Sequence, residues 1–202
     1  MDDAALTVLA LAAGQGDRDA ANTLVHETYG QVRRLMVVLA HRAVADDLTQ
    51  ETFARAVRSL PGFRAESPFR AWLLSIARRT AADHLRATRS RVREEPHGEL
   101  SPELENPVAG DVTEPVLLGM IVENLDPDRR LAFELTQILG LSYLEAAQVC
   151  DCPVGTIRSR VARARDELVG ALAEQRAARP QRLRLGAAPG TGRPDISGPR
   201  VV

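Results

Sequence analysis

The hydrophobic residues of this chain recur at helical spacing in two blocks, and the periodicity stops between residues 87 and 113. Within that interval Pro96, Gly98 and Pro107 are among the residues that break any long element. Aromatic residues make up only 3% of the chain and β-branched runs are few, so a sandwich or barrel is not expected. The pattern predicts an all-α protein with two small helical domains joined by a flexible linker.

The same periodicity sets the expected domain boundaries. We expect a first helical domain over residues 1–87, a linker over 88–113, a second helical domain over 114–174, and a disordered tail rich in Arg, Pro and Gly over 175–202. A helix over residues 44–60 is predicted to turn its apolar residues inward: Val44, Leu48, Phe53, Val57 and Leu60. The next helix should begin at Ser67, as N-cap, with Pro68 at the first helical position.

The charge of the chain is balanced overall but uneven along the sequence. The 26 basic residues, all of them arginine, stand against 27 acidic residues, for a formal net charge of −1. Arginines crowd residues 63–93, whereas residues 94–128 hold ten acidic residues and no basic one. We expect the linker to be acidic and extended, because like charges repel one another.

The cysteines and the N-terminal segment indicate where such a chain works. Cys150 and Cys152 are too few and too close together for the disulfide framework of a secreted domain. The apolar stretch of residues 4–13 follows two acidic residues, whereas a signal peptide begins with a positive segment. No run approaches the roughly 20 apolar residues of a membrane span. The sequence therefore predicts a soluble, cytoplasmic protein.

Residues 142–172 have the layout of a helix-turn-helix. Ser142 and Glu145 have capping-box spacing and open a short helix through Cys150, and Pro153 opens a longer one after the turn. The apolar face of this second helix is expected to comprise Val154, Ile157, Val161, Ala164, Leu168 and Leu172. The opposite face and its flanks could then contact DNA: Gly155, Thr156, Arg158, Ser159, Arg160 and Arg163. The competing interpretation is a solvated arginine face on an ordinary helical bundle.

Four sequence motifs, in order along the chain, resemble one family. They are ADDLTQETF (residues 45–53), FR with SPFRAWLLSIAR (63–64 and 67–78), LGLSYLEAA (139–147) and CPVGTIRSRVARAR (152–165). The first resembles region 2.2 of the extracytoplasmic function (group IV) sigma factors of the sigma-70 family, the second their regions 2.3 and 2.4, and the last two their region 4. The resemblance covers about residues 15 to 172.

The resemblance implies a role for each motif. Region 2.2 docks on the clamp of bacterial RNA polymerase, which implies a clamp-binding set of Asp47, Leu48, Gln50 and Glu51. Regions 2.3 and 2.4 recognise and open the minus-ten promoter element, which implies a DNA-binding set of Phe63, Arg64, Trp72, Arg78, Arg79, Asp83 and Arg86. Trp72 also lies on the apolar stripe, so it is equally consistent with the core. Region 4 implies that the helix-turn-helix binds the minus-thirty-five element.

The resemblance also implies the partners: core RNA polymerase through its β′ clamp and β flap, promoter DNA, and an anti-sigma factor. It implies that the linker threads toward the active-site cleft and the RNA exit path, where its acidic residues would imitate the transcript. Cys150 and Cys152 lack the second ligand pair of a zinc site, and no phosphate loop or triad is visible. No catalysis, metal or cofactor is therefore expected.

Two other classes of function remain as alternatives. The first is a helix-turn-helix regulator that binds duplex DNA without polymerase. The second is an interaction scaffold that binds neither DNA nor polymerase.

Overall fold

The structure is a computed structural model that describes residues 1–94, 119 and 121–185. The N-terminal unit comprises α1 (Asp3–Gly14), α2 (Arg18–Leu39), α3 (Ala45–Ser59) and α4 (Phe69–Glu94), with short turns at Arg42–Val44 and Leu60–Gly62. The C-terminal unit comprises α6 (Pro127–Phe133), the π-helical turn Glu134–Ile138, α7 (Tyr143–Cys150) and α8 (Val154–Leu185). The described residues contain no strand. The all-α prediction is therefore confirmed.

The helices of the N-terminal unit begin at side-chain caps and close over one core. Asp2 caps α1 by accepting from the Ala5 amide at 2.8 Å, and Asp17 caps α2 by accepting from the amides of Asp19 and Ala20. The core includes Leu24, Val32, Leu35 and Met36 of α2 and Leu73, Leu74 and Ala77 of α4. Gly14 allows the end of α1 to approach the turn at Leu60–Gly62, because a Cβ at this position would lie 2.6 Å from the Leu60 carbonyl oxygen.

The helices of the C-terminal unit also begin at side-chain caps, among them the predicted capping box. Asp126 caps α6 with Pro127 in its first turn, and Ser142 and Glu145 form a reciprocal capping box on α7. Gly140 takes a φ of 72° between the π-helical turn and α7, a conformation that glycine adopts without strain. Asp151 takes a φ of 53° and reverses the chain between α7 and α8. The helix-turn-helix is therefore present.

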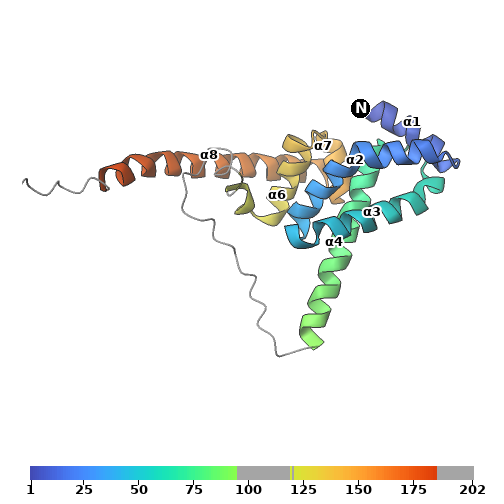
Figure 1. The fold of residues 1–202 in the computed structure, drawn as a ribbon. Helices are drawn as coiled ribbons and strands as arrows, with labels where there is room; N and C mark the ends of the chain where they lie inside the picture. Colours follow the sequence, from blue (N-terminus) through green and yellow to red (C-terminus); the bar gives the residue numbers. More distant parts are fainter. Residues whose placement is uncertain (95–118, 120, 186–202) are drawn as a thin grey trace, which may run out of the picture.

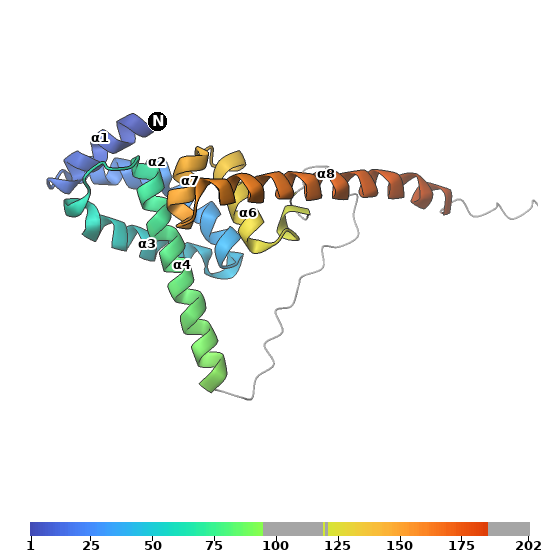
Figure 2. The same ribbon diagram turned by 180° about the vertical axis from the view of Figure 1, so that it is seen from behind.

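The two units pack against each other. Ile157 and Val161 of α8 and Cys150 of α7 belong to the same buried cluster as Leu73 and Leu74 of α4. Figures 1 and 2 show α7 lying beside the first half of α4, while the second half of α4 and the end of α8 extend away from the bundle. The free chain is thus closed, with one buried cluster shared by the two sequence-defined units.

Two helices extend past the boundaries expected from the sequence. Helix α4 continues to Glu94, beyond residue 87, and α8 continues to Leu185, beyond residue 174. The expectation of disorder over 175–185 is wrong, because Arg, Gln, Ala and Leu dominate there and favour helix without an apolar stripe. The rest of the expected linker (95–113) and of the tail (186–202) lies outside the described residues. None of the described helices combines the length and the hydrophobicity that a membrane span requires.

Candidate nucleic-acid interface

Helix α8 has one buried face and one exposed polar face, as the spacing predicts. Ile157, Val161, Ala164 and Leu168 are buried in the core. On the other side, four residues of the expected DNA-binding set are exposed, namely Gly155, Arg158, Ser159 and Arg163, and two are half-buried, namely Thr156 and Arg160. We call these six residues the α8 polar face. The structure brings all of them together.

Arginines of the α8 polar face differ in how firmly they are held. Arg160 pairs with Asp128 of α6, and its guanidinium also lies 3.8 Å from the Cys152 sulfur. Within the part of the chain that the structure describes, Arg158 and Arg163 have no ion-pair partner. These two guanidinium groups are therefore free to bind an incoming anion or base edge.

The two cysteines lie at the turn between α7 and α8. Cys150 is buried, and desolvation raises the pKa of its thiol to about 11, so it packs as a small apolar side chain. Cys152 is half-buried. Among the described residues there is no group of three or more His, Cys, Asp or Glu that could hold a metal ion.

Four of the seven residues expected at the minus-ten element line one cavity of about 450 Å³ between α4 and α6. They are Arg78, Arg79, Asp83 and Arg86. The opposite wall includes Pro127, Asp128 and Leu131 of α6. We call this the α4 cavity. Arg55 of α3 also lines it, although the sequence analysis did not select this residue; its position four residues after Glu51 on a helix was the available signal.

The other three residues of that set lie at the start of α4 and on the loop before it. Phe63 is buried, and its ring lies 5.1 Å from that of Trp72 and 5.9 Å from that of Phe69, measured between centroids. Trp72 is half-buried and packs against the core. Arg64 is exposed. The aromatic residues therefore form a packed cluster that supports the loop on which Arg64 is presented.

Asp83 is bound by two arginines. Arg55 Nη1 donates to Asp83 Oδ2 at 2.6 Å, and Arg86 Nη2 donates to Oδ1 at 2.5 Å. These hydrogen bonds, with that from Arg55 the larger influence, hold the pKa of the Asp83 carboxyl below its ordinary value. Arg55 Nε also donates to Glu51 Oε1 at 2.7 Å, and the two carboxylates raise the pKa of Arg55. Both carboxylate oxygens of Asp83 are therefore hydrogen-bonded within the protein.

The four residues expected to bind the polymerase clamp all lie on α3, and three of them reach its surface. Asp47 and Gln50 are exposed and Glu51 is partly exposed, whereas Leu48 is buried at 7% exposure. Leu48 therefore packs in the core beneath this surface and does not reach it.

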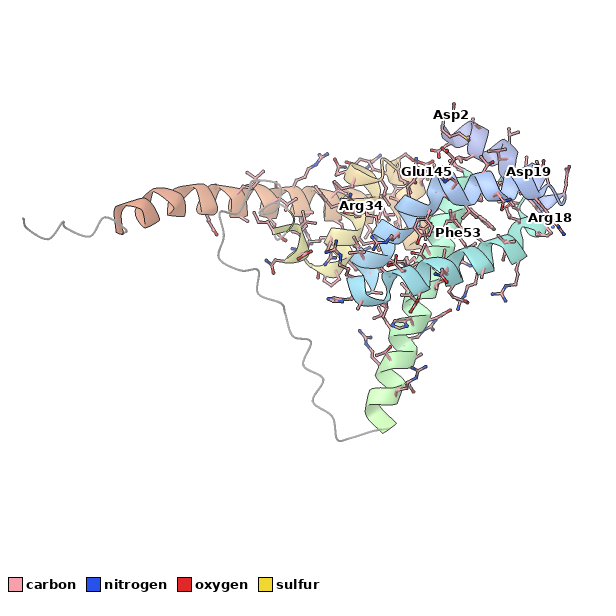
Figure 3. The ribbon with its side chains drawn as sticks, in the orientation of Figure 1. Asp2, Arg18, Asp19, Arg34, Phe53 and Glu145 are labelled. Carbon is pink, nitrogen blue, oxygen red and sulfur yellow. The ribbon has the colours of Figure 1, made fainter. Side chains whose placement is uncertain are left out.

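The prediction that Val57 points inward is wrong, since Val57 is 48% exposed. Val57 lies two helical turns after Gln50, so the two residues share a face of α3. The spacing of apolar residues alone did not show that this face is exposed. Tyr29 of α2 is 38% exposed, and its ring stacks on that of Phe53 of α3, with the ring centroids 6.1 Å apart. The side chain of Phe53 lies between the two helices (Figure 3). We call Tyr29, Asp47, Gln50, Glu51 and Val57 the α3 face.

Comparison with known proteins assigns the two units. The family description "Sigma-70 region 2" matches residues 24–91, and "Sigma-70, region 4" matches residues 116–168. The first range contains the α3 face and the described arginines of the α4 cavity. The second contains α7 and the α8 polar face.

Whole-chain relatives agree with this assignment. The ECF RNA polymerase sigma factor SigC of Mycobacterium tuberculosis is 46% identical over 173 residues, which is 83% of this chain and 91% of that protein. The ECF RNA polymerase sigma-E factor of Haemophilus influenzae is 37% identical over 166 residues, or 75% and 87% of the two chains. The sigma factor RpoE of Bartonella quintana, solved with the anti-sigma factor NepR, has a TM-score of 0.64 at 27% identity over 75% of this chain and 96% of that one. The present chain belongs to the extracytoplasmic function sigma factors of the sigma-70 family, the promoter-recognition and initiation factors of bacterial RNA polymerase.

Proposed function

We propose that this sigma factor binds core RNA polymerase through the α3 face, the minus-ten element through α4 and Arg64, and the minus-thirty-five element through the α8 polar face. The observation that carries this proposal is the division of α8 into a buried apolar stripe and an exposed face with Arg158 and Arg163. A helix built in this way after a three-residue turn suits the major groove.

At the minus-thirty-five element, Arg158 and Arg163 would bind guanine edges or phosphates, because their donors have no ion-pair partner within the described residues. Gly155 and Ser159 are small and exposed, which would let the backbone of α8 approach the bases. Arg160 would position α6 through Asp128 in preference to reading DNA. We expect it to contribute less to promoter affinity than its two neighbours.

At the minus-ten element, Arg78, Arg79 and Arg86 would hold the phosphates of the separated strand. Arg64 would add a contact from the loop that Phe63 and Trp72 support. Promoter opening on such a surface needs binding energy for unstacked bases and no covalent step. This supports an initiation factor without catalytic activity or cofactor.

The α3 face has the composition of a protein interface. Two exposed apolar side chains, Tyr29 and Val57, lie on the same pair of helices as the polar Asp47, Gln50 and Glu51. Interfaces commonly place an aromatic or aliphatic anchor among polar groups that exclude water. We infer that Tyr29 and Val57 form the apolar part of the contact with the β′ clamp, and that the C-terminal unit binds the β flap.

The closed arrangement of the two units would have to open during initiation. The minus-ten and minus-thirty-five elements lie 25 base pairs apart by name, or about 85 Å at 3.4 Å per base pair. Two units that share one core cannot contact both elements at once. An anti-sigma factor, such as the one seen with the Bartonella relative, would act on this equilibrium in the cytoplasm.

The test is co-purification of the full chain with core polymerase, followed by run-off transcription on a promoter with both elements. We expect transcription that requires core polymerase, this chain and both promoter elements. If the chain were instead a helix-turn-helix regulator, it would bind duplex operator by itself and would not bind core polymerase. A scaffold would bind neither.

A further inference from the structure

Arg55 of α3 joins two surfaces that the proposed function assigns to different partners. Its Nε donates at 2.7 Å to Glu51 Oε1, on the α3 face. Its Nη1 donates at 2.6 Å to Asp83 Oδ2, in the α4 cavity. Arg86 donates to the other oxygen of Asp83 at 2.5 Å. One guanidinium therefore connects the expected clamp contact with the expected DNA contact.

These contacts are poised to exchange. The side chains of Arg55, Glu51 and Asp83 are 35%, 44% and 43% exposed, and that of Arg86 is 76% exposed. Water screens ion pairs at such exposures, so a new charged partner can displace an existing one at low cost. The planar guanidinium of an arginine can bind both oxygens of one carboxylate. Arg55 does not do so here, because it divides its donors between Glu51 and Asp83.

We propose, on the basis of the proposed function, that Arg55 is a positioning residue that couples binding of core polymerase to release of Arg86 for promoter DNA. In the free protein, Arg55 divides its donors between Glu51 and Asp83. When a cationic group of the clamp takes Glu51, Arg55 turns both donors to Asp83. Arg86 is then free to bind a phosphate of the minus-ten strand.

The charge of Asp83 favours the exchange. The hydrogen bonds from Arg55 and then Arg86 hold the pKa of the Asp83 carboxyl below its ordinary value, so both arginines favour its ionised form. Arg86 leaves this carboxylate more readily when a second cation supplies both of its hydrogen bonds. Arg55 is the second cation already in contact with this carboxylate. The competing interpretation is a static brace, in which Arg55 only ties α3 to α4.

The experiment uses holoenzyme assembled from core polymerase and the full chain, with a fluorescent single-stranded minus-ten oligonucleotide as the probe. Without Arg55, Asp83 keeps Arg86. Arg55→Gln should therefore weaken oligonucleotide binding by about two- to fivefold. One phosphate contact would also be lost, so the slope of log affinity against log salt should fall by about 0.7.

Removal of Asp83 distinguishes coupling from bracing. In the double variant Arg55→Gln with Asp83→Asn, Arg86 has no carboxylate to hold it, so affinity and salt slope should return to the wild-type values. A lost brace would not be restored by removing its second half. Arg58→Gln is the matched control, because Arg58 lies 4.0 Å from Glu51 and forms no ion pair with Asp83 among the described residues. It should leave both quantities unchanged.

The outcomes separate this inference from the proposed function. If Arg86→Gln leaves oligonucleotide binding unchanged, the assigned minus-ten surface is wrong. If Arg86→Gln weakens binding but Arg55→Gln does not, the surface stands and the coupling is overturned. Failure of Asp83→Asn to rescue Arg55→Gln also overturns the coupling and leaves the brace.

Discussion

Arg34 of α2 forms an ion pair with Glu134 of the π-helical turn, and this pair joins the two units across 100 residues of sequence. The side chain of Glu134 is 4% exposed, whereas that of Arg34 is 55% exposed and lies on the part of α2 next to the C-terminal unit (Figure 3). Arg70 of α4 also joins the two units, because it donates to the carbonyl oxygen of Leu139 in the C-terminal unit. The same guanidinium donates to Gln31 and pairs with Asp3 in the N-terminal unit. The closed state therefore depends on arginines of the N-terminal unit.

Replacing Arg34 should open the molecule. In Arg34→Gln the buried Glu134 carboxylate loses its cation, which costs about 1–3 kcal/mol, and separation of the units would rehydrate it. We expect a larger radius of gyration by small-angle scattering and a lower melting temperature. The double variant with Glu134→Gln removes the buried charge and should restore compactness. Compact Arg34→Gln protein would show that the shared apolar core and the contact of Arg70 with Leu139 keep the units together without this ion pair.

The α8 polar face should respond unequally to loss of its arginines. Arg158→Ala or Arg163→Ala should weaken minus-thirty-five-dependent transcription, since a bidentate base contact is worth about 1–3 kcal/mol. Arg165→Ala is the control, because Arg165 is exposed but already donates to Gln137 at 2.6 Å. The measurement is run-off transcription on promoters with and without the minus-thirty-five element. If both Arg158 and Arg163 can be lost without effect, the face is misassigned.

Periodicity predicted the parts of the fold that depend on local chemistry. The stripe of Ile157, Val161 and Ala164 and the capping box of Ser142 and Glu145 are set by neighbours within one or two turns. Leu48 was correctly expected in the core from its spacing, yet it was also assigned to the clamp from the family resemblance. A motif identifies a helix as important and does not say which of its faces is exposed.

Long-range contacts could not be read from the sequence. The roles of Arg55, Arg70 and Arg34 depend on carboxylates or carbonyls 28, 69 and 100 residues away. No spacing rule links such residues, because only the packing of whole helices brings them together. Val57 was misplaced for a related reason: an apolar residue at helical spacing is buried only where another element packs against it, and Val57 is 48% exposed.

The α3 face should be required for core binding. Asp47→Arg and Val57→Ala both change exposed side chains, so each should reduce co-purification with core polymerase while stability changes by less than about 0.5 kcal/mol. Asp47 is preferable to Glu51 for charge reversal, because a new arginine at 51 would face Arg55 and Arg58. Glu66→Arg is the control, with the same charge change on an exposed loop outside the α3 face. Normal core binding by folded Asp47→Arg and Val57→Ala would exclude this interface.

Asp83 should make stability depend on acid pH. Its folded-state pKa is lowered from 3.8 by the hydrogen bonds from Arg55 and then Arg86. A lowered pKa in the folded state means that the contribution to stability is fully present above the unfolded value and is lost as pH falls through the folded value. Wild type should therefore exceed Asp83→Asn in melting temperature at neutral pH, and the difference should shrink as pH falls below 3.8. Thermal unfolding of both proteins across this range, followed by circular dichroism, measures the effect. A difference that stays constant down to the lowest pH would mean that ionisation of Asp83 does not contribute to the stability of the fold.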